Sequence, residues 1–173
     1  MKLHIGGTIP NPDWKILDVI PGPHVDFVGS CTDLGGFADR SIDEIYASHV
    51  LEHLGYREEL PQALSEWHRV LRPGGALKIA VPDMMTLCGM FAHPQLPQPL
   101  INVILAMMYG GQGDPHDFHK MGFTKELLGA FLHAAGFERI EQVEDFGLFD
   151  DTSRTKIGTI PISLNVQAFR PAG

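Results

Sequence analysis

The sequence predicts an α/β fold built around a mostly parallel β-sheet, and residues 45–83 carry most of that prediction. An apolar stretch at 45–47 ends in Ser48 and His49, and a helical pattern follows. Ala76–Val81 is then apolar almost without a break, which is typical of a strand buried on both faces. Strand, helix and strand in this order form a βαβ unit, and parallel sheets bind ligands at the carboxyl ends of their strands.

The helix of this unit is predicted from apolar side chains that recur at helical spacing, namely Leu60, Leu64, Trp67 and Leu71. It ends at Pro73-Gly74-Gly75, because proline cannot continue a helix and glycine readily adopts a positive φ. The same patterns predict helices at 57–72, 98–108 and 124–135. Strands are expected at 2–5, 15–19, 25–29, 42–47, 76–81, 138–144 and 161–169.

The connections after the first two strands are unusually short for a parallel sheet. Residues 6–14 and 20–24 are too short for covering helices, and both stretches contain prolines. The sequence therefore predicts a reduced number of helices on one face of the sheet. Because the first strands are rich in large apolar residues, we expect that face to be apolar and to need another cover.

Composition narrows the class of protein. A chain of 173 residues with 44% hydrophobic residues predicts one domain with its own core. A net charge of −8 without a Lys/Arg cluster argues against nucleic-acid binding. Two cysteines, Cys31 and Cys88, are too few for a disulfide framework and favour a reducing cytoplasm. We expect no signal peptide, and the apolar run at 100–109 is too short for a membrane span.

Three sequence segments closely resemble those of the class I S-adenosylmethionine (SAM) dependent methyltransferases, specifically the short branch called methyltransferase type 11. They are Ser41-Ile42-Asp43, His49-Val50-Leu51-Glu52-His53 and the segment Arg69–Gly75. A helix and exit turn over 122–137 complete the resemblance. It implies a Rossmann-like class I methyltransferase sheet, mostly parallel with a C-terminal antiparallel hairpin. It also implies one domain over 1–173, with 84–122 inserted as a lid or substrate segment.

The resemblance places the cofactor, SAM, at the carboxyl ends of the first strands. Gly6, Gly7 and Thr8 occupy its glycine-rich loop, and Asp18 is expected to hold the cofactor ribose. The remaining cofactor residues are expected to be Ser30, Cys31, Asp33, Leu34, Ser48 and His49. Two positions depart from the family, which usually has glycine at Thr8 and an acid at Ser30.

Histidines supply the candidate catalytic groups. His116 and His119 follow a glycine-rich stretch in the insert, and a similar segment forms substrate loops in related proteins. Either could take a proton from the acceptor, and His53 is the third candidate. The predicted function is methyl transfer from SAM to a small-molecule or sugar-containing acceptor. The alternative is a catalytically degenerate member that binds a partner or a nucleotide-like ligand without turnover, which Thr8, Ser30 and the missing helices would favour.

The stretch His49–His53 also matches H-x-x-E-H, a zinc-protease motif in which both histidines must face one metal from one helix. Because His49 directly follows a strand, the two histidines are not expected to share a helical face. We therefore predict no metal. Finally, the largely apolar segment 84–109 and the face that lacks helices are expected to form the interface of a homodimer.

Overall fold

In the computed structural model, which describes residues 1–173, the chain forms a seven-stranded sheet in the order β3-β2-β1-β4-β5-β9-β6. The pairs β3-β2, β2-β1, β1-β4 and β4-β5 are parallel, and β9 runs antiparallel to both β5 and β6. The strands are β1 Lys2–Ile5, β2 Trp14–Asp18, β3 Phe27–Val28, β4 Ile42–Ser48, β5 Leu71–Pro82, β6 Glu138–Val143 and β9 Ser163–Phe169. The predicted fold class is confirmed.

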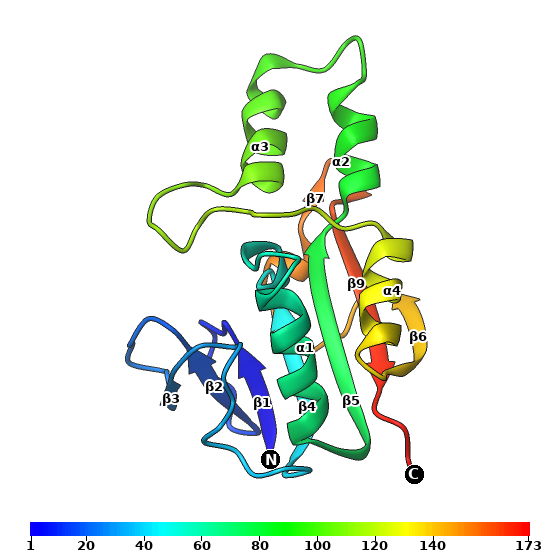
Figure 1. Ribbon diagram of the computed structural model, residues 1–173. Coiled ribbons are helices and arrows are strands. Elements are labelled where there is room, and N and C mark those ends of the chain that lie inside the picture. The colour runs from blue at the N-terminus through cyan, green and yellow to red at the C-terminus, as the bar shows by residue number, and fades with distance from the viewer.

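Two helices cover one face of this sheet. They are α1 Glu59–Val70, between β4 and β5, and α4 Lys125–Ala134, between β5 and β6 (Figure 1). A core of 25 buried residues lies between them and the strands, with Trp67 of α1 wholly buried at its centre. Of all the helices, none has the length and hydropathy of a membrane span.

The opposite face has no helix over β1, β2 and β4, as the short connections predict. Its side chains are not the apolar set that we expected, because strand alternation sends Leu3 and Ile5 to the α1 side. The helix-free face instead carries charged groups, with Lys2 Nζ 2.8 Å from Glu44. Lys78 also pairs with Glu44. The helix-free face is therefore mixed, because Trp14 and Tyr46 are also buried on it, and the expectation of an apolar face holds only in part.

The upper part of that face is covered by the segment 144–155 of the same chain. Phe149 packs against Tyr46 and Trp14, with ring centroids 5.1 and 5.7 Å away. The Tyr46 hydroxyl donates to a carboxylate oxygen of Asp151 at 2.8 Å. A loop thus replaces the missing helices where the face is aromatic, and no second chain is needed there.

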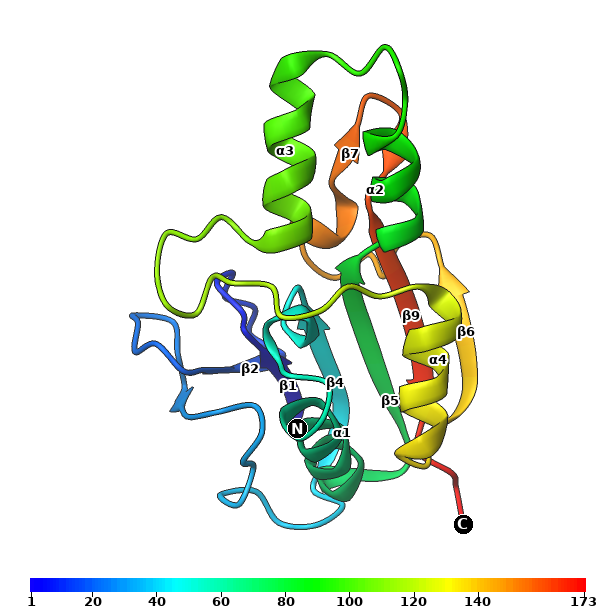
Figure 2. The same ribbon diagram turned by 45° about the horizontal axis from the view of Figure 1, so that its top comes forward.

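The insert stands at the carboxyl edge of the parallel strands, away from the body of the sheet (Figures 1 and 2). It contains α2 Met84–Phe91 and α3 Gln98–Tyr109, and the sequence did not predict α2. Leu87, Ile104 and Ile162 form a small core between these helices and the hairpin of β7 Lys156–Ile157 and β8 Ile160–Pro161. The insert therefore packs on this hairpin, not on the helix-free face.

The two ends of the insert lie next to each other. Asp83 and Phe123 form an isolated β-bridge, and the Met84 amide donates to the Phe123 carbonyl at 3.0 Å. Asp83 also starts α2, since its side chain accepts from the amides of Met85 and Thr86. The chain therefore leaves the sheet and returns to it at one point, as an inserted segment should.

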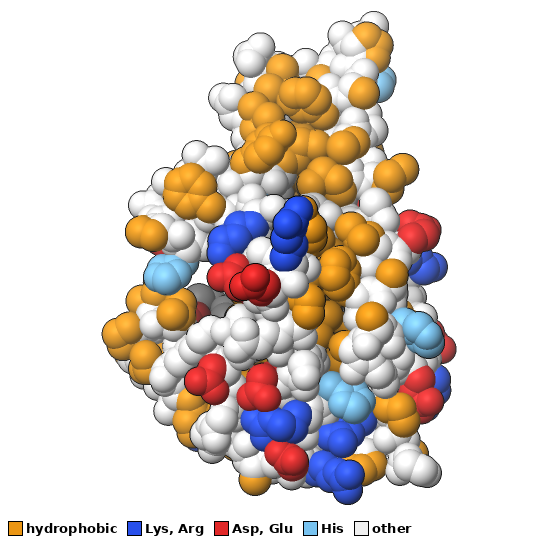
Figure 3. All heavy atoms as spheres, viewed as in Figure 1, with side chains coloured by type: hydrophobic (Ala, Val, Ile, Leu, Met, Phe, Trp, Pro, Cys, Tyr) orange, Lys and Arg blue, Asp and Glu red, His pale blue; other side chains and the backbone are white.

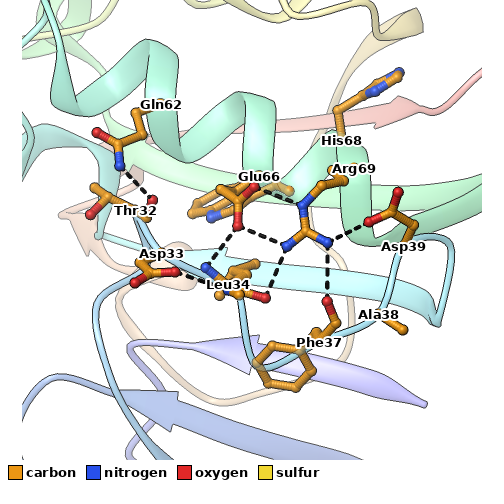
Figure 4. Close-up of polar contacts among 12 residues, drawn as sticks. Thr32, Asp33, Leu34, Phe37, Ala38, Asp39, Gln62, Glu66, His68 and Arg69 are labelled. Atoms are coloured by element: carbon orange, nitrogen blue, oxygen red, sulfur yellow. Dashed lines mark hydrogen bonds and ion pairs between the residues drawn. The ribbon is translucent and has the colours of Figure 1, made fainter.

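The loop 29–41, which follows β3, is held by side chains of α1 (Figure 4). Arg69 donates to the carbonyls of Leu34 and Phe37, each at 3.0 Å, and forms ion pairs with Glu66 and Asp39. Glu66 in turn accepts from the Leu34 amide at 2.9 Å. One arginine of α1 thus holds the loop 29–41 against the helix, although the loop itself has no regular secondary structure.

Two further side chains of α1 reach the same loop closer to β3. Trp67 Nε1 donates to the Cys31 carbonyl at 2.8 Å, and Gln62 donates to the Thr32 carbonyl at 3.1 Å. These bonds satisfy backbone acceptors that neither a helix nor a strand would satisfy. Helix α1 therefore positions the edge of the cavity described next.

Candidate active site

Two adjoining cavities open at the carboxyl ends of β1, β2 and β4. One, of about 430 Å³, is bounded by Asp18, Ile20 and the loop 29–32, and we call it the cofactor-side cavity. The other, of about 400 Å³, lies beneath α3 and the loop 111–119, and we call it the acceptor-side cavity. Gly6, His49 and His53 line both, so the two cavities meet at these residues.

The turn after β1 needs both of its glycines. Gly6 has a φ of +69°, and an added Cβ would lie 2.6 Å from the Val50 side chain. At Gly7 an added Cβ would lie 2.5 Å from the buried His4 ring. Thr8 does not have a positive φ, so its branched side chain fits its backbone without strain. The turn therefore brings bare backbone to the junction of the two cavities.

Asp18 ends β2 at the cofactor-side cavity. Its Oδ1 accepts from the Ile20 amide at 2.7 Å, and its other carboxylate oxygen has no partner in the chain. Ile20 and Val19 beside it are about half exposed, so an apolar surface adjoins the carboxylate. A ligand with paired hydroxyls and a flat apolar ring matches this combination.

Several predicted cofactor residues lie in or beside the two cavities. Ser30 and Cys31 line the cofactor-side cavity, while Thr8 and Ser48 line the acceptor-side cavity. Burial raises the pKa of the Cys31 thiol to about 11, so it stays protonated at neutral pH. Cys31 is thus an uncharged wall of its cavity.

Other predicted positions line neither cavity. Leu34 is wholly buried in the core beneath α1. Asp33 is exposed, and its carboxylate accepts from the Gly35 amide in a local turn. Gly7 lies against His4 and shapes the turn without reaching either cavity. These residues support the walls, and their contacts give them no direct role toward a ligand.

The three predicted catalytic histidines all lie at the cavities. His116 is exposed on the cofactor side, His119 is on the acceptor side and largely buried, and His53 borders both. The rings of His53 and His119 lie 4.8 Å apart between centroids. Burial lowers the pKa of His119, an effect that nearby Glu52 opposes.

His49 and His53 do not share a helical face, as expected. His49 has a φ of +56° at the end of β4, and His53 ends the 3₁₀ turn η1 Leu51–His53. A positive φ is uncommon for a residue with a side chain. Here it turns the His49 ring toward β9, where Nε2 lies 2.9 Å from the Ser163 hydroxyl.

Sequence reasoning missed Glu52 and the α1 side chains that hold the loop 29–41. Glu52 is wholly buried within η1, beside His49 and His119. The sequence did carry a signal, because Glu52 lies inside the H-x-x-E-H stretch. Its burial was not visible there.

Residues 17–79 match the model of a family described as a methyltransferase domain. Solved methyltransferase structures share this fold over nearly the whole chain. The whole chain has the class I methyltransferase fold. The resemblance of the three sequence segments to class I methyltransferases is thus confirmed.

Solved structures resemble this class I methyltransferase fold over nearly the whole chain. A possible exported protein from Bordetella parapertussis has a TM-score of 0.61 at 11% identity, covering 99% of this chain and 62% of that one. A SAM-dependent methyltransferase from Archaeoglobus fulgidus has a TM-score of 0.61 at 18% identity, covering 98% and 85%. This chain therefore spans less than two thirds of the first of these proteins.

A third structure contains ligands. It is the Burkholderia thailandensis 1,6-didemethyltoxoflavin-N1-methyltransferase with bound 1,6-didemethyltoxoflavin and S-adenosylhomocysteine. Its TM-score is 0.59 at 16% identity, covering 98% of this chain and 71% of that one. No curated protein matches the chain in sequence. At these identities the solved structures establish the fold of the chain alone, and its chemistry must come from its own residues.

Proposed function

We propose that this protein is a SAM-dependent methyltransferase that acts on a small-molecule or sugar-containing acceptor. The observation that carries the proposal is the junction of two cavities at Gly6, His49 and His53, next to the Asp18 carboxylate. A methyl donor and an acceptor each need a site, and the reacting atoms must meet. Two cavities joined at bare backbone provide that arrangement.

The residues of the cofactor-side cavity fit SAM. The unpartnered Asp18 oxygen can accept from a ribose hydroxyl, and Ile20 and Val19 offer an apolar surface to the adenine. The turn at Gly6 leaves room for the methionine part, because a side chain there would collide with Val50. When bound, SAM supplies a methyl group on a sulfonium, which is already activated for transfer.

The residues of the acceptor-side cavity would orient the acceptor and handle its proton. His53 and His119 border it from the η1 turn and the loop 111–119. His116 lies on the same loop, and the glycines at 110, 111 and 113 give the loop hinge freedom. Most of the catalytic effect would come from alignment, with one histidine taking a proton.

The alternative proposal, a degenerate member that binds without turnover, loses part of its support. It rested on Thr8, Ser30 and the missing helices, and Thr8 causes no backbone strain. Ser30 remains a departure, and its hydroxyl pairs with Thr32 at 2.7 Å. Calorimetric titration with SAM, followed by a screen for methyl transfer, distinguishes the two functions, because only the enzyme must transfer a methyl group from SAM.

The test of the cofactor site compares Asp18→Ala with Asp33→Ala by calorimetric titration of SAM. Asp18→Ala should weaken binding by about 1.5–3 kcal/mol, the range for a hydrogen bond to a charged group. Asp33→Ala, a nearby carboxylate outside both cavities, should bind like wild type. Equal affinities for all three proteins would show that SAM does not bind at Asp18.

A second proposal concerns the exposed apolar side chains of α2 and α3. The side chains of Met85, Phe91, Val103 and Tyr109 are exposed, and hydrophobic side chains gather over α2 and α3 in Figure 3. We propose that this surface pairs with a second copy of the chain, since large apolar patches are uncommon on monomers.

Cys31 and Cys88 are both free thiols, which supports the proposal of a cytoplasmic location.

A further inference from the structure

The buried carboxylate of Glu52 has no hydrogen-bond partner. Its side chain is 0% exposed, and neither oxygen accepts a hydrogen bond. His49 Nδ1 lies 3.1 Å from Oε1 but is not aligned to donate, and His119 Nε2 lies 4.0 Å away. A buried carboxylate without a partner costs several kcal/mol. The site is therefore built for a cation.

Two histidine rings present unprotonated nitrogens at the same place. His53 Nδ1 lies 3.2 Å from the Phe118 carbonyl, and His119 Nδ1 lies 3.0 Å from the Met107 carbonyl. A carbonyl oxygen can only accept, so in each ring Nδ1 carries the proton and Nε2 of the neutral ring keeps its lone pair. Histidines that bind metals are oriented in this way by a carbonyl or carboxylate.

The backbone brings these rings to Glu52. The Lys120 amide donates to the Glu52 carbonyl at 2.7 Å, which fixes the segment after the insert against the η1 turn. Glu52, His53 and His119 can each offer one ligand atom, and these atoms lie within 4.8 Å of one another. Zinc binds its ligand atoms at about 2.0–2.2 Å, so ligand atoms around a bound zinc lie closer to one another than these three do. Modest side-chain rotations would bring them to those distances.

A protonated His49 or His119 could also neutralise Glu52, but His49 Nδ1 makes no hydrogen bond to it although it lies 3.1 Å from Oε1. A protonated His119 would need Nε2 within hydrogen-bond distance of the carboxylate, whereas the two atoms are 4.0 Å apart. It would also place a second ring, that of His53, 4.8 Å from a charged one. An ion between the three side chains satisfies all of them at once.

We propose that Glu52, His53 and His119 bind one divalent transition-metal ion, with zinc the best match to two imidazoles and one carboxylate. This set differs from the H-x-x-E-H pair considered from the sequence, because His119 takes the place of His49. The expectation of no metal rested on His49 and His53 not sharing a helical face.

The ion would lie at the acceptor-side cavity, which His53 and His119 line. Three protein ligands leave a coordination position open, and an oxygen of the acceptor, from a hydroxyl or a carboxylate, could fill it. This part rests on the proposed function. His116, which is not in the ligand set, would then be the histidine left free to take a proton.

The test is titration of tag-free, chelator-treated protein with Zn²⁺ and with Co²⁺, by calorimetry and by absorption. We expect a single equivalent to bind, with Co²⁺ bands typical of nitrogen and oxygen ligands. His53→Ala and His119→Ala should each lower the affinity more than the 10–100-fold loss seen for second-shell partners. Mg²⁺, which prefers oxygen ligands, should not bind.

His116→Ala is the matched control, since it removes a histidine from the same loop without touching the three ligands. It should bind zinc like wild type. Circular dichroism melting of each variant separates loss of a ligand from loss of the fold. The proposal is overturned if folded wild type binds no saturating equivalent of Zn²⁺ or Co²⁺ at micromolar concentration. It is equally overturned if folded His53→Ala and His119→Ala bind as tightly as His116→Ala.

Metal binding is measured without SAM, so its failure is separate from failure of the proposed function. Zinc binding without methyl transfer would support the site and leave the acceptor assignment overturned. Methyl transfer by a protein that binds no zinc would support the function and overturn this inference.

Discussion

Replacing Arg69 by methionine should destabilise the protein by about 2–4 kcal/mol. Methionine keeps the aliphatic stem but removes the guanidinium, which donates to the Leu34 and Phe37 carbonyls at 3.0 Å each (Figure 4). Each of the two bonds from this charged donor contributes about 1–2 kcal/mol, reduced from the usual range of about 1.5–3 because Arg69 is 29% exposed. The Asp39 pair adds little, since Asp39 is 71% exposed.

The assay is urea denaturation at neutral pH, comparing Arg69→Met with Arg72→Met. Arg72 is 56% exposed and pairs only with Asp43, so its loss should cost less than about 1 kcal/mol. A lower midpoint with an unchanged slope would show lost stability without a change in the surface exposed on unfolding. If Arg69→Met is no more destabilising than Arg72→Met, α1 does not hold the loop 29–41 in the way described.

Two further predictions concern pH and the insert. Burial lowers the pKa of His4 to about 4, against an unfolded value of 6.5, so stability should fall by roughly 3 kcal/mol as pH drops from about 6.5 to 4. Urea denaturation at several pH values in this window should show that the free energy of unfolding of His4→Gln falls less with decreasing pH than that of wild type. An equal fall in both proteins would refute the assignment. Val103→Glu should convert a dimer into a 19.1 kDa monomer in sedimentation equilibrium with little change in melting, since Val103 is exposed. Ile104→Glu should instead unfold the insert, because Ile104 is wholly buried within its own chain, and equal melting of the two variants would contradict that packing.

Much of the fold could be predicted because its signals are local in the sequence. The expected strand at 2–5 has the bounds of β1, and the helix predicted at 98–108 is α3 with one more residue. The prolines in the first two connections correctly predicted a face without helices. Helix α2 was missed although Asp83 caps it, because the apolar residues of 84–91 have no clear helical spacing.

The charged part of the helix-free face was not predicted, although the sequence contains the pattern that shows it. Counting apolar residues in the first strands ignored their alternation, which sends Leu3 and Ile5 to the α1 side and Lys2 and His4 to the other. What covers that face could not be predicted. Phe149 reaches Tyr46 from a loop that no periodic pattern marks.

By itself, the sequence determined the α/β class, the order of the seven strands of the main sheet with α1, α3 and α4, the glycine turn after the first strand and Asp18 at the end of the second. Each depends on residues close together in the chain, where periodicity and backbone preference act. Only the tertiary structure decided that Arg69 ties down the loop 29–41 and that Glu52 is buried beside His119. Those contacts join segments far apart in the chain, and they arise from backbone bonds and burial that no local pattern specifies.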